Sequence, residues 1–321
     1  MKMKTMLGLT LSLLMVPGMV AFGFEPKGSI DFVCPYSAGG GSDVMARTIA
    51  SVMQNYTDAN PVVQNLSGGS GLVGTSYVYA KAGDDMTLLT YAPGPLAAAI
   101  ANDAECSWDK LTQVCVMALE EQTLCVQPGK FADLAELIEY SKEHPGEVTI
   151  AGTTIGNEDH MCVYLLNKLA EAGLTYVTYD SAGDILTAIM GGHVTGGIVN
   201  PSECMSQVKS GDVDCLCSFG ANDINFIDGF EEVPTAASFG YDIDFVMYRS
   251  IAAAPNMSED ALAYWVDLFK KVSEDPAWTE DYVGAKGLVN QFISGEELTA
   301  FLQNQYDMYY ALELEAGIIS E

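Results

Sequence analysis

The chain has 321 residues, of which 49% are hydrophobic and 18% are charged. That much apolar material is enough for two packed domains and excludes an intrinsically disordered protein. The formal net charge of −29 makes nucleic acid and anionic membrane surfaces poor partners, because both are themselves negatively charged.

The first 23 residues are predicted to be a secretory signal peptide. Lys2 and Lys4 supply a positive start, residues 6–20 form an apolar run, and Ala21 and Gly23 offer small side chains for cleavage. We expect a soluble mature protein that begins near Phe24 and resides in the periplasm. An uncleaved leader that anchors the chain is the alternative. No later stretch has 18 uninterrupted apolar residues, so we expect no further membrane span.

Strands and helices are predicted to alternate through most of the chain. A strand at residues 30–34 leads through a glycine loop into a helix over residues 44–56, and Ser42 is the expected N-cap of that helix. Further strands are expected at 61–64, 87–90, 114–119, 123–126, 148–151, 196–199 and 215–218. Further helices are expected at 134–143, 161–172, 185–190 and 205–209. Such alternation predicts parallel sheets covered by helices.

The C-terminal part is predicted to be helical. One helix is expected to begin after Ser258, because the acidic residues that follow suit the positive end of its dipole. Another is expected to begin after Asp275, with Pro276 at its first position. Ser294 and Glu297 have the spacing of a capping box at the start of the last helix.

Eight cysteines follow the leader. An exported protein with an even number of cysteines can form disulfides. However, Cys34, Cys125, Cys215 and Cys217 lie in apolar, strand-like runs, where a free cysteine behaves as a small hydrophobic residue. We therefore favour free thiols in the core over disulfides. No CxxC pair occurs and no histidine has zinc-ligand spacing to a cysteine, so we expect no metal site.

The loop at residues 39–43 is the strongest candidate site. It connects a strand to a helix, so free backbone N–H groups and the positive end of the helix dipole face the same point. Carboxylate oxygens accept hydrogen bonds from such groups without any basic side chain. A plain glycine-rich turn is the alternative interpretation.

Residues 69–74 match the GxGxxG pattern of dinucleotide-binding loops. Such a site needs an acidic residue at the end of a second strand about 20 residues further on, whereas Asp84 and Asp85 precede a strand. We interpret the segment as a turn that lines a cleft, and we expect no cofactor. Neither a GxSxG elbow nor an HExxH or P-loop motif occurs, so the sequence does not favour an enzyme.

A series of further segments carries a family resemblance. Residues 27–43 comprise a lysine, a strand, a glycine loop and an aspartate, and Ala46-Arg47 follow in the next helix. The same pattern continues in order at residues 62–74, 84–89, 134–146, 156–160, 179–194 and 233–235. Together these segments resemble the receptor family of tripartite tricarboxylate transporters over nearly the whole mature chain. The chain departs from that pattern at Ser37-Ala38, where the family has two prolines, and at Asp180-Ser181, where it has Lys-Gly.

The resemblance implies an α/β protein with the type II periplasmic binding protein fold. Its two lobes would each have a central, mostly parallel sheet flanked by helices, and a two-strand hinge would join them. We expect residues 24–119 and 250–321 in lobe 1 and residues 120–249 in lobe 2, with crossovers near 119–124 and 245–251.

The family's function implies that the protein captures a small organic acid between its lobes and delivers it to a membrane permease. We expect the receptor to be a monomer. A periplasmic receptor that feeds a membrane sensor is one alternative. A periplasmic enzyme that acts on a small acid is the other.

Ligand contacts are expected in loops at the carboxyl ends of strands, where α/β crevices bind their ligands. The candidate residues are Tyr36, Ser37, Ala38, Gly39, Gly40, Gly41, Ser42, Asp43, Tyr91, Ala92, Pro93, Thr153, Thr154, Asn157, His160, Ser181, Ala182, Gly183, Asn200 and Ser202. The alternative is that these Ser, Thr and Asn side chains only cap helices. We expect His160 to be a structural hydrogen-bonding residue.

No lysine or arginine lies in these candidate loops. The sequence therefore suggests that a carboxylate is held by the N–H groups of residues 38–42, by hydroxyls such as those of Ser37 and Thr154, and by water. Arg249 lies near the second crossover, where its side chain could reach the cleft and pair directly with the ligand. Both accounts remain open at this point.

Overall fold

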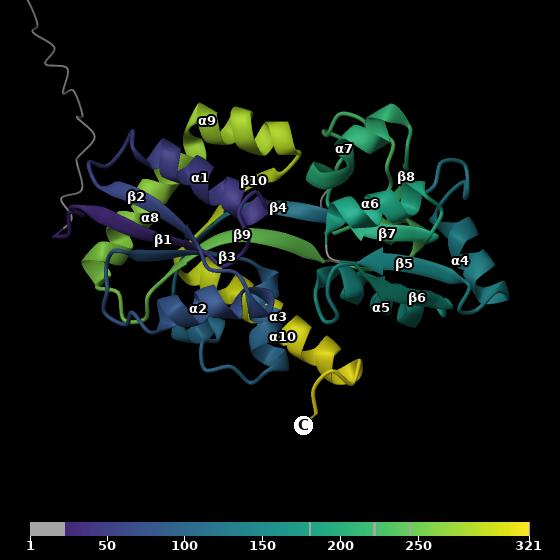
Figure 1. Cartoon of the computed structure of the whole chain (residues 1–321), viewed down its shortest axis with the longest axis horizontal. Coiled ribbons are helices and arrows are strands. Elements are labelled where there is room, and N and C mark those ends of the chain that lie inside the picture. The colour runs from purple at the N-terminus through teal and green to yellow at the C-terminus, as the bar shows by residue number, and fades with distance from the viewer. Residues whose placement is uncertain (1–22, 180, 221–222, 244, 321) are drawn as a thin grey trace, which may run out of the picture.

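The computed structural model describes residues 23–179, 181–220, 223–243 and 245–320. The predicted signal peptide up to residue 22, and Asp180, lie outside these residues. Figure 1 shows two α/β lobes side by side, joined by long strands that run from one to the other. In the described part of the chain, no helix is both long enough and apolar enough to cross a membrane.

Three parallel strands form the centre of the first lobe: β1 (Ser29–Cys34), β2 (Asn60–Asn65) and β3 (Thr87–Tyr91). Strand β3 is buried along its whole length, as expected for a strand covered by helices on both faces. The helices of this lobe are α1 (Gly41–Met53), α2 (Leu72–Tyr79), α3 (Pro93–Ala101), α8 (Glu259–Glu274), α9 (Pro276–Trp278) and α10 (Gly295–Glu315).

The second lobe repeats this arrangement around β5 (Val148–Gly152), β6 (Leu174–Thr178) and β7 (Gly196–Val199), which are again parallel. Its helices are α4 (Leu134–Glu143), α5 (Glu158–Ala170), α6 (Ala182–Met190) and α7 (Pro201–Ser210). Strand β8 (Asp214–Phe219) completes its sheet. Short helical turns occur at Gly69–Gly71, Trp108–Lys110, Ala236–Phe239 and Thr279–Gly284.

Two long strands run between the lobes. Strand β4 (Thr112–Val126) pairs antiparallel with β9 (Val246–Ala253) from Thr112 to Glu121, and its last residues pair with β7 and β8. Strand β9 also pairs with β3 in the first lobe, while the short strand β10 (Val289–Ile293) pairs with β4. The predicted type II architecture, with two lobes and a two-strand hinge, is therefore confirmed.

Two local predictions about these elements are wrong. The strands expected at residues 114–119 and 123–126 are one continuous strand, because the intervening polar residues Glu120, Glu121 and Gln122 are buried in the crossover and not exposed in a turn. The C-terminal part is not wholly helical as predicted, because strand β10 interrupts it between α9 and α10. Strand β6, helix α2 and helix α3 were not predicted, since none of them has a clear apolar period.

Two capping predictions are also wrong. Ser42 is not an N-cap, because Gly40 takes the extended backbone conformation that precedes α1 and the helix begins at Gly41. Ser294 does occupy the N-cap position of α10, but its side chain accepts no capping hydrogen bond. A capping box occurs instead at α7, between Asn200 and Glu203. The predicted caps at Ser258 and Asp275 are confirmed.

The cysteines are core residues. All eight are free thiols, and all but Cys215 are buried. The sulfur atoms of Cys125 and Cys204 lie 3.8 Å apart. This arrangement confirms the preference for core thiols, which contribute to packing in the way that small apolar side chains do.

Candidate functional site

The loops at the carboxyl ends of the strands enclose a cavity of about 440 Å³ between the two lobes. Twelve of the residues singled out in the sequence line it: Tyr36, Gly40, Gly41, Ser42, Ala92, Thr153, Thr154, Asn157, Ser181, Ala182, Asn200 and Arg249. An adjoining hollow of about 320 Å³ shares part of this wall and adds Gly39, Gly183 and Ser202. The topology thus brings together loops that are widely separated in the chain.

Six of the predicted residues line neither hollow: Ser37, Ala38, Asp43, Tyr91, Pro93 and His160. Tyr91 is fully buried in the first lobe. His160 accepts a hydrogen bond through Nδ1 from the Gly156 N–H at 3.2 Å, and its ring lies against Tyr176. It therefore holds its own loop, as expected of a structural histidine.

Asp43 supports the glycine loop from behind. One carboxylate oxygen accepts hydrogen bonds from the Gly39 N–H at 2.9 Å and from Arg47 Nε at 3.0 Å, and the other accepts from Asn65 Nδ2 at 2.8 Å. Burial opposes ionisation of this carboxyl, but these hydrogen bonds outweigh burial and hold its pKa at about 2. The loop is therefore fixed by a permanent anion that faces away from the cavity.

Asp159 has the same role in the second lobe. Its Oδ2 accepts hydrogen bonds from the Thr153 N–H at 2.8 Å and from the Thr153 hydroxyl at 2.7 Å. Asn157 Nδ2 donates to that same hydroxyl at 2.8 Å. Each lobe thus presents a loop whose shape is set by an aspartate in the first turn of the following helix. Both loops are held in place before any ligand arrives.

Five helices of eight or more residues begin at this cavity. The first residues or N-caps of α1, α3, α5, α6 and α7 all line it. No side chain in the described part of the chain caps α1 or α3, whereas Asn157, Ser181 and Asn200 cap the other three. Helix N-termini carry partial positive charge and free N–H groups. The cavity is consequently suited to bind an anion.

Arg249 is the buried cation of the cavity wall. It lies on β9 beside Gly41, where a Cβ atom would be only 3.1 Å from its Nη1. Its Nη2 donates a hydrogen bond to Glu120 Oε2, which is fully buried on the neighbouring strand β4. Burial disfavours the charged form of Arg249, but the charge and hydrogen bond of Glu120, together with the nearby Tyr282 and Glu203, outweigh burial and raise its pKa. Arg249 therefore remains a guanidinium, paired within the protein and open to the cavity.

Three glutamates also line the cavity: Glu158, Glu203 and Glu313. Burial raises the pKa of Glu158 and of Glu313 to about 8, and that of Glu203 to about 7. Glu203 is partly satisfied, because its Oε2 accepts a hydrogen bond from the Asn200 N–H at 3.0 Å. Acidic side chains of this kind are unexpected in a cavity suited to anions.

Ser70 lines the cavity, as expected for the turn at residues 69–74. Several other lining residues were not predicted: Asn102, Glu158, Glu203, Met247 and Glu313. Glu158 lies within a candidate loop. However, acidic residues are common in the first turn of a helix, so its position did not mark it as a ligand contact. Glu313 comes from the last turn of α10, far along the chain from any loop motif. No local pattern in the sequence places that side chain in the cleft.

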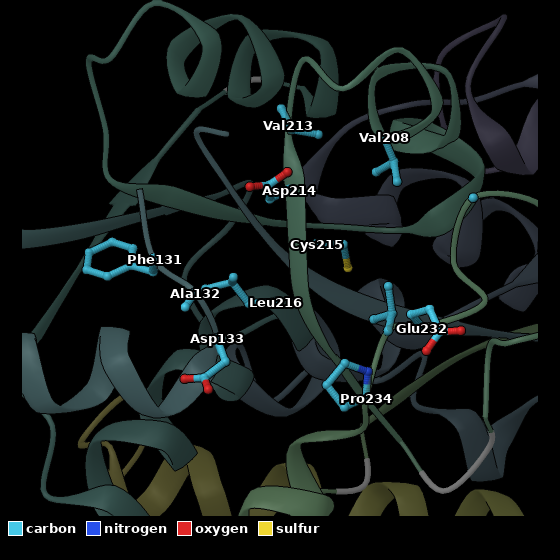
Figure 2. A pocket seen from close by; sticks show the side chains of 12 residues that line it. Phe131, Ala132, Asp133, Val208, Val213, Asp214, Cys215, Leu216, Glu232 and Pro234 are labelled. Atoms are coloured by element: carbon cyan, nitrogen blue, oxygen red, sulfur yellow. The ribbon is translucent and has the colours of Figure 1, made fainter. Parts of the chain in front are cut away.

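A separate hollow of about 500 Å³ lies on the second lobe (Figure 2) and is called the second hollow below. Asp133, Asp214 and Glu232 project around it. Asp133 caps α4 by accepting from the Glu136 N–H, and Asp214 accepts from the Gly129 N–H at 2.7 Å. Two of its three carboxylates are therefore used structurally. The described residues contain no cluster that could hold a metal ion.

Comparisons with known proteins agree with this geometry. The model of the tripartite tricarboxylate transporter family receptor matches residues 45–314. The curated protein BugT of Bordetella pertussis is 28% identical over 221 residues, which is 67% of each chain. MatC of Rhodopseudomonas palustris, solved with bound malate, aligns over 89% of this chain and 99% of its own, with a TM-score of 0.73 and 19% identity. The R. palustris protein Rpa4515, solved with adipate, aligns over 91% and 98%, with a TM-score of 0.77 and 20% identity.

Proposed function

Because the chain belongs to the receptor family of tripartite tricarboxylate transporters, we propose that it captures a small organic carboxylate between its lobes and delivers it to a membrane permease. Its place of action is the periplasm, after cleavage of the leader near Phe24. The family consists of receptors, so we assign the protein a binding role and no reaction. Malate and adipate in the two solved relatives support a carboxylate as the ligand class.

The convergence of five helix N-termini on one cavity is the observation that carries this proposal. A carboxylate placed there meets oriented N–H groups and several partial positive charges at once. Those dipoles are fixed by the fold, so they need no reorganisation when the ligand binds. A neutral solute of the same shape would gain much less binding energy from these dipoles.

We propose that the ligand carboxylate lies at the start of α1, against the N–H groups of Gly41 and Ser42 and the guanidinium of Arg249. The close approach of Arg249 to Gly41 supports a role for the arginine side chain. We therefore propose that backbone N–H groups and Arg249 hold the carboxylate together. Ser181 and Ala182 face the same region from the second lobe. A carboxylate at this point would contact both lobes and favour their closure about β4 and β9.

A thermal-shift screen tests the proposal. Mono-, di- and tricarboxylates and amino acids are compared with their uncharged amides at pH 7. A specific ligand at a hundredfold excess over its dissociation constant should stabilise the protein by about 2.7 kcal/mol. Stabilisation by the uncharged amides, with none by any acid, would contradict a carboxylate site.

The transport role has its own test. A strain that lacks this protein should lose uptake of the acid found in the screen, and the full-length gene should restore it. Unimpaired uptake in the deletion strain would contradict delivery to a permease. Glu232→Gln, in the second hollow, is the matched control variant and should restore uptake fully.

A further inference from the structure

Two carboxyl groups in the cavity wall have buried oxygen atoms that lack a hydrogen-bond partner among the described residues. Neither Oε1 nor Oε2 of Glu313, nor Oε2 of Glu158, has a partner among the described residues. Glu313 is fully buried and Glu158 is 5% exposed, yet both side chains line the cavity. Burying a carboxyl group without a partner is costly, so their place at a ligand cavity calls for a ligand group that offsets the cost.

In the described part of the chain, no cation forms an ion pair with either carboxyl group, although the positive charge of Arg249 acts to lower the pKa of Glu158. Arg249 lines the same cavity, but its guanidinium is already paired with Glu120. Lys286 belongs to the adjoining hollow and not to the wall that holds Glu158 and Glu313. Among the described residues that line the main cavity, the charged side chains are therefore one arginine with its own partner and three further carboxyl groups.

The two glutamates come from different lobes and line the same cavity. Glu158 begins α5 in the second lobe, while Glu313 is in the last turn of α10, which packs in the first. A Cβ atom on Gly156 would lie 3.8 Å from Glu313 Oε1, so α10 reaches the loop that carries Glu158. A ligand group between these carboxyls would contact both lobes.

We infer that the ligand carries a cationic nitrogen as well as a carboxylate, with its carboxylate at the start of α1 and its ammonium group between Glu158 and Glu313. This inference rests on the proposed function and names its ligand class: amino acids or other zwitterions, in preference to dicarboxylates. A dicarboxylate would place its second charge against the glutamates, whereas an ammonium group donates hydrogen bonds to them.

The protonation of Glu158 and Glu313 gives this inference a second readout. Burial raises the pKa of both carboxyls, so in the free protein they are largely protonated at pH 7. An ammonium group stabilises their ionised forms, and its binding should release protons. A second carboxylate should instead bind with proton uptake. The titratable and charged groups that interact with Glu158 are Tyr36, Asp159, Cys162, Tyr176, Glu203, Tyr248, Arg249 and Tyr309.

Isothermal titration of the mature protein with matched ligands tests the inference. Each common amino acid is compared with its deaminated acid, and 4-aminobutyrate, 5-aminopentanoate and 6-aminohexanoate are compared with succinate, glutarate and adipate. The best amino compound should bind at least tenfold more tightly than its matched acid and than any dicarboxylate. Titrations in phosphate and in Tris should show that its binding releases protons.

Glu158→Gln and Glu313→Gln should each weaken the amino compound at least tenfold and leave the binding of dicarboxylates unchanged or stronger. Glu232→Gln should change neither. Because glutamine has almost the same shape and no charge, both variants should fold, and a thermal melt checks this. Tighter binding of dicarboxylates, or proton uptake with the best ligand, would overturn the inference and leave the proposed function standing. Failure of every acid to bind would overturn both.

Discussion

Replacing Glu313 by glutamine should stabilise the free protein by an amount that grows with pH. Glu313 is fully buried in the last turn of α10, and burial raises its pKa from 4.5 to about 8. At pH 4.5 and below, the carboxyl is largely protonated in the folded protein and contributes no penalty. As the pH rises, the unfolded chain ionises this group freely while the folded protein does not, so stability is lost progressively up to about pH 8.

The pKa sets the size of the effect. A pH of 7 lies about 2.5 units above the ordinary pKa of 4.5 and below the pKa in the folded protein, so at ~1.4 kcal/mol per unit the penalty is about 3 kcal/mol. Solvent that reaches the cavity partly screens the carboxylate, so we expect a smaller penalty of about 2 kcal/mol. Glu313→Gln removes the ionisable group and should therefore raise the free energy of unfolding by that amount at pH 7, with almost no change at pH 4.5.

Urea unfolding of both proteins at pH 4.5, 6 and 7 measures this difference. Glu315→Gln is the matched control on the same helix. Its carboxylate accepts a hydrogen bond from Lys168 at 2.7 Å, which lowers its pKa, so its loss should not stabilise the protein at pH 7. A Glu313→Gln effect that is equal at pH 4.5 and pH 7 would refute the reasoning, because it would mean that the carboxyl ionises as freely in the folded protein as in the unfolded chain.

Three further predictions follow from the same cavity. Gly41→Ala places a methyl carbon about 3.1 Å from Arg249 Nη1 and should weaken ligand binding roughly tenfold by calorimetry, with little change in the melting temperature. Arg249→Gln leaves Glu120 buried and unpaired, so urea unfolding should show a loss of roughly 3–5 kcal/mol, and Glu120→Gln in the same chain should recover part of it. Small-angle scattering should show a smaller radius of gyration with saturating ligand, and an unchanged radius would contradict closure of the lobes.

The overall architecture could be predicted from the sequence because it depends on repeated local patterns. Apolar runs separated by glycine loops and amphipathic helices predict strands with helical connections, and the ends of α4 and β7 were predicted to the residue. The break expected within β4 was wrong because Glu120, Glu121 and Gln122 look like a turn until Arg249 and the partner strands are known.

Local sequence patterns likewise predicted one part of the candidate site and not the other. Residues in loops after strands, such as Gly41, Thr153 and Ser181, were predicted because topology alone sends such loops to one edge of a sheet. Glu313 could not be predicted, since its place in the cavity depends on how α10 packs across the first lobe to reach the second. The sequence showed an excess of acidic residues but gave no sign of which ones would be buried against a ligand.

Hydrogen–deuterium exchange with and without the best ligand of the screen tests the central claim most directly. Binding between the lobes should slow exchange together in peptides that cover residues 36–44, 153–160, 181–186 and 246–250. Peptides around the second hollow, at residues 129–134 and 229–234, should not change. Protection confined to the second hollow, or to the loops of one lobe alone, would contradict a ligand held between the two lobes.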